Sequence, residues 1–473
     1  MSGRRVRLVC TLGPATAKRE AVWALAEAGC DVFRINFSHG GAEDHLSAVQ
    51  NVRAVCHELG RDLALMADLP GPKVRLGELG SESVKLPAGA RFVLRAGGGP
   101  GDAGGARISY PNLAADVRPG DRVLMADGTV ELVVRSIQGD DVVTEVARAG
   151  SIRAHAGVNV PAERLNLPAI TDHDRKALAT ALDLGADLVA QSFVRTGDDV
   201  AKLRALMSDR VLAIVAKIET RPAVESIDDV LAEADAVMVA RGDLGVELAM
   251  EEIPVLQKEL LRTARVAGRA AIVATQMLES MTHAPRPTRA EASDVANAVL
   301  DGADAIMLSA ETAIGEFPAE AATAAATIAR VAEHRGAAFQ AARPPCTHTE
   351  EGAAVAHAAA QIAVDDPEVA AVVCFTRTGR TAALLSGERP PAPIFAFAPD
   401  ASVRRALALR WGVAALPATV PADTDEMIGL MDRGLREAGV ARDGDGVVLV
   451  ASSPFGRAHT NMIKIHRVGG ATA

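Results

Sequence analysis

The sequence predicts an α/β fold, a (β/α)8 barrel with an inserted small β domain and a separate C-terminal α/β domain. Short apolar runs alternate with segments of helical periodicity, which is typical of βα units built around a parallel sheet. Eight such runs occur before residue 310, and eight parallel strands can close into a barrel. The alternation is interrupted between the third and fourth runs by a long segment with another pattern.

The predicted barrel strands are short apolar runs, most of them rich in Val, Ile, Ala and Leu. They are Val6–Cys10, Asp31–Ile35, Leu63–Ala67, Leu188–Phe193, Leu212–Lys217, Ala236–Ala240, Ala270–Ala274 and Ala305–Leu308. The predicted helices between them are Ala17–Ala28, Ala42–Leu59, Asp174–Leu184, Val224–Ala234 and Glu291–Leu300. Several of these helices are followed by Gly, a common helix-terminating residue. Aromatic residues make up only 3% of the chain, so the core depends on branched aliphatic side chains, which suits parallel sheets.

The interrupting segment, near residues 70–159, predicts a small β domain. Its features are a Gly-rich tract from Gly97 to Gly105, turns at Pro119-Gly120-Asp121 and Asp127-Gly128, and short β-branched runs. A third region begins after Arg343-Pro344-Pro345. It has a helical pattern around Ala353–Val364 and strand-like runs at Ala370–Phe375, Pro393–Phe397, Gly446–Ala451 and Met462–Val468. We therefore expect a barrel formed by 1–69 and 160–340, an inserted domain at 70–159, and a C-terminal domain at 341–473.

Composition narrows the function classes. The 473 residues are 49% hydrophobic with a net charge of -10, which indicates a globular protein without a general nucleic-acid surface. An anionic small substrate would need a local positive pocket. The five scattered cysteines, Cys10, Cys30, Cys56, Cys346 and Cys374, form no CxxC pair and support neither a disulfide framework nor a zinc site. No signal peptide or membrane-spanning run is found, so we expect a cytoplasmic protein.

Polar side chains follow six of the eight predicted barrel strands. In a parallel barrel the active site lies at the carboxyl ends of the strands. Any one of these residues alone could be a helix cap or a surface residue, but their recurrence indicates an active site. They are Arg34, Asn36, Ser38, His39, Asp68, Lys73, Arg75, Lys217, Glu219, Arg241, Asp243, Thr275, Gln276, Ser309 and Glu311, with Gly242 between Arg241 and Asp243 as a backbone candidate.

Two of these residues, Lys217 and Glu219, stand two apart and can share one face of the barrel mouth. Glu219 and Asp243 supply carboxylates from neighbouring strands, and a few hard oxygen ligands suit Mg2+ or Mn2+. The alternative is a Lys217–Glu219 ion pair that only supports the barrel. Gly242-Asp243-Leu244-Gly245 predicts a loop that opens a short helix, whose free N–H groups could bind a carboxylate or phosphate.

Four long segments resemble the signatures of the pyruvate kinase family, and they occur in the expected order. They are Arg34 to Gly40 (RINFSHG), MVARGDLGVE (238–247), ATQMLESM (274–281) and PRPTRAEASDVANAVLDGADAIMLSAET (285–312). The similarity extends from Cys10-Thr11-Leu12-Gly13-Pro14 into the C-terminal domain. The resemblance implies a TIM barrel with a β lid, a homotetramer, and transfer of a phosphoryl group from phosphoenolpyruvate to ADP, giving pyruvate and ATP.

The resemblance also implies roles for the matching residues. Glu219 and Asp243 would bind the divalent metal that holds phosphoenolpyruvate, while Arg34 and Lys217 would face the transferring phosphoryl group. The Gly242 and Asp243 amides and the Thr275 hydroxyl would hold the substrate carboxylate, with Thr275 on the route by which the enolate is protonated. Arg75, His39 and Asn36 would serve the nucleotide, which the lid would cover.

The chain departs from the family pattern at the junction with the lid. The usual DTKGPEIR is replaced by residues 68–75, DLPGPKVR, so Leu69 and Lys73 stand for Thr and Glu. In potassium-dependent relatives, positions matching Asn36, Ser38, Asp68 and Leu69 hold the ion. The ammonium of Lys73 could take the place of this ion, and the Leu and Lys pair resembles the potassium-independent branch. The alternative is that Lys73 points into solvent.

A loop in the C-terminal domain is a candidate effector site. The residues are Thr376, Arg377, Thr378, Gly379, Arg380 and Thr381, between a strand and a helical pattern. Such a loop can cradle phosphate. It resembles the family's effector-phosphate loop, which implies activation by a sugar phosphate or AMP, whereas the alternative is an ordinary strand–helix turn.

Two rival functions stay open at this point. One is a catalytically silent relative that binds nucleotide or sugar phosphate without turnover. The other is a different barrel enzyme that uses phosphoenolpyruvate, such as an aldolase or carboxylase relative. The intact Lys217, Glu219, Asp243 and Thr275 argue against the first, and the lid has no evident purpose in the second.

Overall fold

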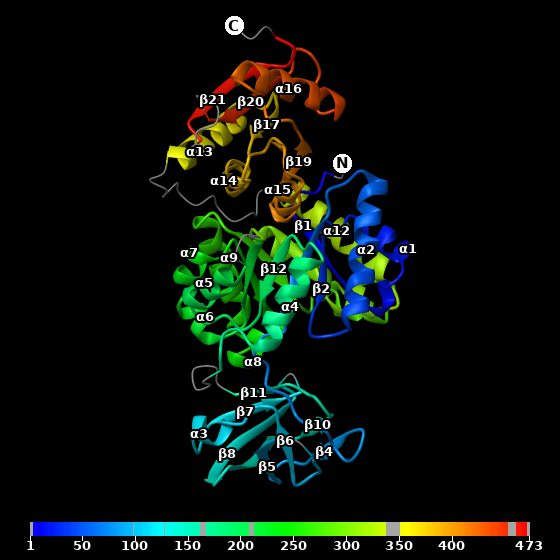
Figure 1. The fold of residues 1–473 in the computed structure, drawn as a ribbon, viewed down its shortest axis with the longest axis vertical. Helices are drawn as coiled ribbons and strands as arrows, with labels where there is room; N and C mark the ends of the chain where they lie inside the picture. Colours follow the sequence, from blue (N-terminus) through cyan, green and yellow to red (C-terminus); the bar gives the residue numbers. More distant parts are fainter. Residues whose placement is uncertain are drawn as a thin grey trace.

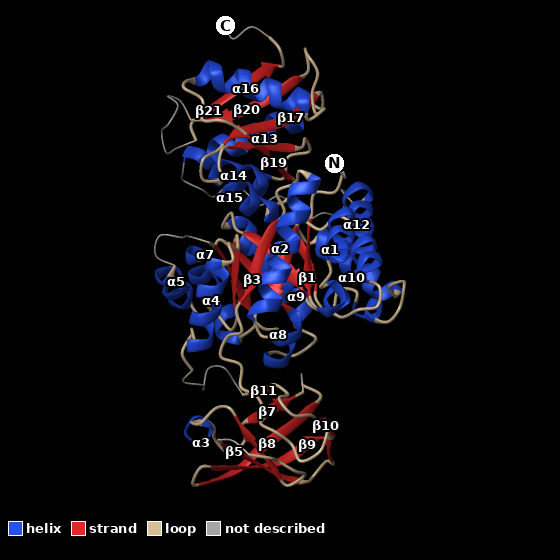
Figure 2. Cartoon of the chain, turned by 45° about the vertical axis from the view of Figure 1, so that its right-hand side comes forward, coloured by secondary structure: helices blue, strands red, loops and turns tan. Residues whose placement is uncertain are grey.

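The computed structural model describes residues 3–97, 99–126, 128–160, 167–207, 212–336, 351–452 and 460–470. Figures 1 and 2 show these residues as three regions along one long axis, with the barrel between the inserted sheets and the C-terminal sheet. Each region has its own apolar core. Among the described helices, none is both long enough and apolar enough to cross a bilayer.

The predicted barrel is confirmed. Its eight strands are parallel and close in the order β1-β16-β15-β14-β13-β12-β3-β2. Alternate side chains fill the barrel interior, including Val9, Met66, Val215 and Ile272, while their neighbours pack under the surrounding helices. The strands are β1 (Arg7–Leu12), β2 (Val32–Asn36), β3 (Ala64–Asp68), β12 (Leu188–Gln191), β13 (Ala213–Ile218), β14 (Ala236–Ala240), β15 (Ala270–Ala274) and β16 (Ala305–Leu308).

Some of the helices that cover the barrel have a local capping reason for their first or last residue. Gly60 ends α2 with φ 60°, and Thr288 and Glu291 form a capping box at the start of α10. The barrel helices are α1 (Arg19–Glu27), α2 (Ala42–Leu59), α4 (Asp172–Asp183), α5 (Gly197–Leu206), α6 (Arg221–Glu225), α7 (Ile227–Glu233), α8 (Arg241–Glu247), α9 (Ile253–Val266), α10 (Arg289–Leu300), α11 (Ala310–Ala313) and α12 (Pro318–Arg335). Two short 3-10 helices also belong to this region, η1 (Pro14–Thr16) and η2 (Glu279–Thr282).

Several predicted barrel elements are shifted by one or two residues at an end, and two of the differences have a clear backbone cause. The helix expected over Val224–Ala234 is divided into α6 and α7 at Ser226, whose φ of -108° and ψ of 26° leave the helical region. The strand expected over Leu188–Phe193 stops at Gln191, because Phe193 has a positive φ of 55° that a strand does not accommodate.

The inserted segment folds into two antiparallel-rich sheets that face the barrel mouth. The larger sheet has the order β11-β7-β8-β9-β5-β6, and β10 pairs with β4. Phe92, Leu94, Val123 and Leu132 are fully buried in its core. The elements are β4 (Val84–Leu86), β5 (Arg91–Ala96), β6 (Gly105–Ile108), α3 (Leu113–Asp116), β7 (Arg122–Met125), β8 (Val130–Gln138), β9 (Asp141–Arg148), β10 (Gly150–Ile152) and β11 (Val158–Asn159). Gly98 of the Gly-rich tract and Asp127 of the second turn lie outside the described residues.

The C-terminal region is a five-stranded sheet in the order β19-β18-β17-β20-β21, with β21 antiparallel to β20. Its two faces are covered by α13 and α14 on one side and α16 on the other. The elements are α13 (Glu351–Asp365), β17 (Val369–Phe375), α14 (Arg380–Glu388), β18 (Ile394–Ala398), α15 (Ala401–Ala406), η4 (Leu407–Leu409), β19 (Val413–Pro417), α16 (Thr424–Glu437), β20 (Gly446–Ala451) and β21 (Met462–Arg467). The sequence analysis missed β19, and Arg343-Pro344-Pro345 and Cys346 lie outside the described residues.

Candidate active site

The candidate residues gather where the barrel strands end, on the side that faces the inserted sheets. Figure 1 shows α8, which follows β14 directly, between the barrel and β11. The opposite end of the barrel faces the C-terminal region, where the Arg7 Nε at the start of β1 donates to the Arg410 carbonyl at 2.9 Å. The site therefore lies between the barrel and the inserted domain.

A buried lysine occupies the centre of this site. Lys217 near the end of β13 has its Nζ 2.9 Å from the Glu219 Oε1 and 3.3 Å from the Asp68 Oδ1. The same Nζ lies 2.8 Å from the Ser192 Oγ. Burial lowers the pKa of Lys217, but the carboxylates of Asp68 and Glu219 raise it further, so the pKa lies above its ordinary value. The neighbouring carboxylates therefore favour the charged form of Lys217.

A second cation shares the central carboxylate. The Arg34 Nε donates to the Asp68 Oδ2 at 2.7 Å, and its Nη1 donates to the Thr11 Oγ1 at 3.0 Å. Burial raises the pKa of Asp68, but Lys217 and Arg34 outweigh burial and hold the pKa below its usual range. Asp68 thus stays ionised and holds both cations in place.

Two carboxylates lie beside this cationic pair. Glu219 is 1% exposed, and its Oε2 accepts the Phe193 N–H at 2.8 Å. The pKa of Glu219 is raised by burial, lowered by Lys217 and raised again by the nearby carboxylate of Asp243, with a net increase. Asp243 on α8 has a side chain that is 28% exposed. A divalent cation between these two groups would relieve their repulsion, so the residues fit a metal of this kind.

Among the described residues, no group of three or more His, Cys, Asp or Glu side chains has the arrangement of a metal cage. A metal held by Glu219 and Asp243 would therefore leave most coordination positions to substrate oxygens and water. This is the pattern expected where a metal ion binds together with a phosphorylated substrate.

The turn after β15 is strained. Thr275 and Gln276 have φ of 69° and 55°, two successive non-glycine residues in the left-handed region. Such a conformation costs about 1–3 kcal/mol for each residue. The Thr275 Oγ1 accepts the Gly242 N–H at 2.8 Å and donates to the Ala274 carbonyl at 2.6 Å. The strain and these contacts fix the position of the Thr275 hydroxyl.

The prediction that a loop at Gly242 to Gly245 opens a short helix with free N–H groups is confirmed for the short helix, but it is wrong for the loop and for the Gly242 N–H. The segment lies inside α8, which begins at Arg241 directly after β14, so no loop precedes the helix. The Gly242 N–H already has an acceptor in Thr275. The sequence pattern did not reveal this contact because it depends on the left-handed turn of another strand.

The lid junction places a further cation at the site. The Lys73 Nζ lies 3.4 Å from the Asp243 Oδ1, and the side chain of Lys73 is 25% exposed. Its stem passes Gly157 so closely that a Cβ on that glycine would lie 3.0 Å from the Lys73 Cε. The alternative that Lys73 simply points into solvent is therefore not what the structure shows.

The residues that match the potassium positions have partners within the chain. The Asn36 Oδ1 accepts the Ser38 N–H at 3.0 Å, and the carbonyl of the buried Leu69 accepts the Ser192 hydroxyl at 2.8 Å. The carboxylate of Asp68 is held by Arg34 and Lys217. Of these groups, Asp68 contacts the pair of Arg34 and Lys217 directly, and Leu69 is linked to it through Ser192, whose hydroxyl also lies 2.8 Å from the Lys217 ammonium.

The nucleotide candidates lie nearer to the surface. The Arg75 Nη1 donates to the His155 carbonyl at 3.2 Å, and His39 is exposed. Burial lowers the pKa of His39, and the positive charges of Arg75, Arg34 and Lys73 lower it further. His39 and these three cations therefore share one positive field at the barrel mouth.

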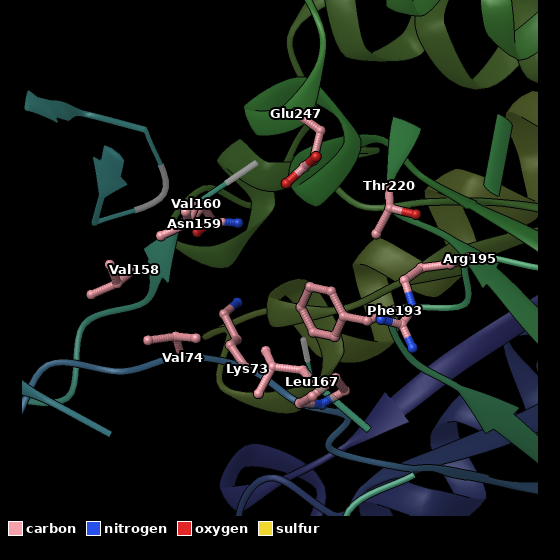
Figure 3. A pocket seen from close by; sticks show the side chains of 11 residues that line it. Lys73, Val74, Val158, Asn159, Val160, Leu167, Phe193, Arg195, Thr220 and Glu247 are labelled. Atoms are coloured by element: carbon pink, nitrogen blue, oxygen red, sulfur yellow. The ribbon is translucent and has the colours of Figure 1, made fainter. Parts of the chain in front are cut away.

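A cleft of about 480 Å³, open to solvent, adjoins the site. Figure 3 shows residues from both of its sides, with Val158 and Asn159 from β11 and Glu247 from α8. Lys73 and Phe193 also line it, whereas Arg34, Lys217 and Thr275 do not. The cleft therefore separates the inserted domain from the barrel beside the charged centre.

The candidate effector loop joins β17 to α14. The buried Thr376 Oγ1 accepts the Gly379 N–H at 2.9 Å, and Gly379 has a φ of 84° that favours glycine. The Thr381 and Thr460 hydroxyl oxygens lie 2.7 Å apart. Thr378 is exposed at the tip of the loop.

Sequence reasoning missed several residues that contact the central ones. Ser192 directly follows β12 and could have been found by the same strand-end rule, but it was placed inside the longer predicted strand. Thr11 lies within β1 and was not considered, although its hydroxyl accepts from Arg34. Arg241 was singled out, but its contacts with the turn at Thr275 could not be foreseen.

Comparison with known proteins gives matches over nearly all of the chain. A family model described as "Pyruvate kinase, barrel domain" matches residues 3–322, and one described as "Pyruvate kinase, alpha/beta domain" matches residues 353–466. A Mycobacterium tuberculosis protein named pyruvate kinase is 43% identical, covering 98% of this chain and 99% of its own. A protein of the same name from Corynebacterium efficiens is 42% identical, covering 99% of this chain and 99% of its own. Another from Geobacillus stearothermophilus is 39% identical, covering 99% of this chain and 81% of its own.

Proposed function

The chain belongs to the pyruvate kinase family, and on that premise we propose that it transfers the phosphoryl group of phosphoenolpyruvate to ADP, giving pyruvate and ATP. The observation that supports this most directly is the charged centre. Lys217 lies between Asp68 and Glu219, with Arg34 on the other side of Asp68. A silent relative would not need to keep these groups together in a buried site.

The reaction needs positive charge where the phosphoryl oxygens gather negative charge. Phosphoryl transfer depends mostly on positioning and on stabilising the charge of these oxygens. We propose that Arg34 and Lys217 supply that charge, held in position by Asp68 before the substrate arrives. Lys217 also stabilises the enolate that remains after the phosphoryl group has left.

Members of this family generally use a divalent metal. We propose Mg2+ or Mn2+, with Glu219 and Asp243 as the protein ligands. When bound, the metal neutralises negative charge on the substrate oxygens. The contribution of the chain is to bring two carboxylates together next to Lys217, so that the metal and the lysine can contact the same substrate molecule.

The strained turn at Thr275 has two proposed roles, binding of the substrate carboxylate and protonation of the enolate. We propose that the carboxylate binds at the Gly242 and Asp243 amides and beside the Thr275 hydroxyl, replacing Thr275 as the acceptor of the Gly242 N–H. The Thr275 hydroxyl then lies on the route along which the enolate of pyruvate is protonated. Lys217 is less suited to this step, because its raised pKa keeps the proton on its ammonium.

The nucleotide would bind between the barrel and the lid. We propose that Arg75, His39 and Asn36 contact ADP or ATP, and that residues 70–159 close over it to exclude water. Residues 1–69 and 160–340 would form the catalytic domain, and residues 341–473 a regulatory and oligomerisation domain. We further propose a homotetramer that works in the cytoplasm, which mass measurement in solution and cell fractionation would test.

A coupled assay tests the activity directly. Pyruvate formation from phosphoenolpyruvate is measured with and without ADP while metals and monovalent salts are varied. Strict dependence on ADP and a divalent metal supports the proposal. Release of inorganic phosphate without ADP would favour another phosphoenolpyruvate enzyme, and no turnover under any condition would favour the silent relative.

We expect Glu219→Gln or Asp243→Asn to raise the Mg2+ concentration for half-maximal activity by about tenfold or more and to lower turnover. Loss of one carboxylate leaves the metal a single protein ligand. The measurement is a Mg2+ titration at saturating substrates. Glu311→Gln is the control: Glu311 is as buried as Glu219, and within the described part of the chain its carboxylate accepts backbone N–H groups, those of Leu278 and Ser309, and is not one of the two proposed metal ligands. An unchanged titration in the Glu219 and Asp243 variants would remove both residues from the metal site.

The loop before α14 supports a second prediction, activation by a sugar phosphate or AMP. We expect such an effector to lower the phosphoenolpyruvate concentration for half-saturation, and Thr378→Ala with Thr381→Ala to abolish this response without changing the basal curve. Thr378 is exposed beside the Gly379 turn and Thr381 lies buried behind it, and threonine hydroxyls at such a turn can bind phosphate oxygens. A panel of phosphorylated metabolites that leaves the saturation curve unchanged would contradict the prediction.

A further inference from the structure

The guanidinium of Arg241 joins the ends of β14 and β15, where the substrate carboxylate is proposed to bind. Arg241 and Thr275 directly follow Ala240 and Ala274, which are paired in the register of β14 and β15. The Arg241 Nη2 donates to the Thr275 carbonyl at 2.7 Å and to the Gln276 carbonyl at 3.4 Å. These are the two residues with left-handed backbone.

The other end of the guanidinium is anchored outside the site. The Arg241 Nη1 lies 2.7 Å from the Asp294 Oδ1 on α10, and 3.5 Å from the Gln257 Oε1 on α9. The side chain of Arg241 is only 12% exposed. Its direction is thus set by the covering helices and not by the site itself.

A threonine does not adopt a positive φ without help, because its branched side chain collides with the backbone there. Two carbonyl contacts from one rigid, planar group can hold such a turn. Before the substrate carboxylate replaces it as acceptor, the Thr275 hydroxyl also accepts the N–H of Gly242, the residue after Arg241, which adds a third link in the substrate-free site. The position of that hydroxyl therefore depends on the segment Arg241-Gly242.

We propose that Arg241, anchored by Asp294, is the positioning residue of Thr275: it holds the Thr275–Gln276 turn in its left-handed form and so aims the Thr275 hydroxyl at the substrate. Arg241 itself does not contact the reacting atoms. This inference rests on the proposed role of Thr275 and extends it, because it makes the function of Thr275 depend on an ion pair outside the site.

The test combines single variants with a double-mutant cycle. Asp294→Ala removes the anchor, Asp294→Asn keeps an oxygen acceptor at the same place, and Arg241→Lys removes the planar group that reaches two carbonyls. The matched control is Asp235→Ala, since the Asp235 pair with Arg204 has a similar length of 2.9 Å and a similarly exposed carboxylate, at 33% against 34% for Asp294. Turnover, KM for ADP and thermal unfolding are measured for each variant with the full-length enzyme.

We expect Asp294→Ala and Arg241→Lys to lower kcat by about 10- to 100-fold, the scale of a misplaced group, with an unchanged KM for ADP. Asp294→Asn should recover part of the loss. In the background of Thr275→Ala, adding Asp294→Ala should cause no further loss, because the two changes remove the same function. Deuterium uptake into the methyl group of pyruvate should fall in parallel in both single variants, which a purely structural role would not require.

Several results would overturn the inference. One is that Asp294→Ala and Arg241→Lys have the same kcat as the control Asp235→Ala. Another is that the fold-losses in kcat of Asp294→Ala and Thr275→Ala multiply in the double variant. If Asp294→Ala does not fold, Asp294→Asn and Arg241→Lys decide by the same criteria. A Thr275→Ala enzyme with normal turnover would overturn both this inference and the role of Thr275. Pyruvate formation by the unmodified enzyme would still support the proposed activity in that case.

Discussion

Lys217→Met is expected to reduce turnover by about 100- to 1000-fold or more, while phosphoenolpyruvate still binds, since removing a preorganised charge from a developing anion costs about 3–4 kcal/mol. Lys217 is buried, and its ammonium contacts Asp68, Glu219 and Ser192. Methionine keeps an unbranched apolar stem, one heavy atom shorter, and removes the charge together with the ammonium's contacts. The loss therefore reports on the electrostatic role.

The fold should survive this change, because Asp68 keeps Arg34 as its partner at 2.7 Å. Thermal unfolding checks this, and binding of phosphoenolpyruvate is measured separately from turnover. Lys258→Met serves as the control, since Lys258 is a half-exposed lysine paired with Asp301 on the surface of the barrel. Retention of more than about a tenth of the original turnover would show that the charge of Lys217 is not aimed at the transition state.

The barrel was predictable because most of its strands are continuous apolar runs with polar residues at or near their ends. β14, β15 and β16 begin and end at the predicted residues, since each is buried on both faces and nothing local competes with the strand. The predicted fourth strand was too long, because Phe193 reads as an apolar strand residue. Its left-handed backbone, with an N–H that Glu219 accepts, is a tertiary effect.

The candidate site was predictable as a set of residues but not as a set of contacts. The strand-end rule gave Lys217, Glu219 and Asp243, which the structure brings together at one mouth. It could not give the direction of a side chain that comes from another part of the chain. The contact of Lys73 with Asp243 depends on the path of the lid junction past Gly157, which no local pattern encodes.

The geometry of Lys73 leads to the prediction about monovalent cations: we expect the enzyme to be fully active without potassium. Three observations favour this. The Lys73 ammonium already supplies a positive charge next to Asp243. The pKa of His39 is lowered by burial, then by Arg75 and Arg34, and then by Lys73. The positive charge of Lys73 therefore also acts on His39, which follows Asn36 and Ser38 in the chain. The carbonyl of Leu69 and the carboxylate of Asp68 already have donors within the chain.

Lys73→Glu, alone or with Leu69→Thr, should create a dependence on potassium. The substitution changes the local charge by two units and places a carboxylate where an ammonium lay, which makes a bound monovalent cation favourable. Without potassium, turnover should fall by about 100-fold, comparable to the loss of another preorganised charge at a phosphoryl site, and added potassium should restore it. The measurement is turnover in tetramethylammonium buffer at saturating Mg2+, with and without potassium chloride.

Two controls separate the creation of a cation site from the simple loss of a charge. Lys73→Met removes the ammonium without adding a carboxylate, so its turnover should fall but should not recover fully with potassium. Lys85→Glu makes the same change of charge at an exposed position on β4 and should change neither turnover nor its salt dependence. Full dependence of the unmodified enzyme on potassium would contradict the prediction. Equal activation of Lys73→Met and Lys73→Glu by potassium would also contradict it. In that case the ion would only fill the space of the missing ammonium, and the new carboxylate would play no part.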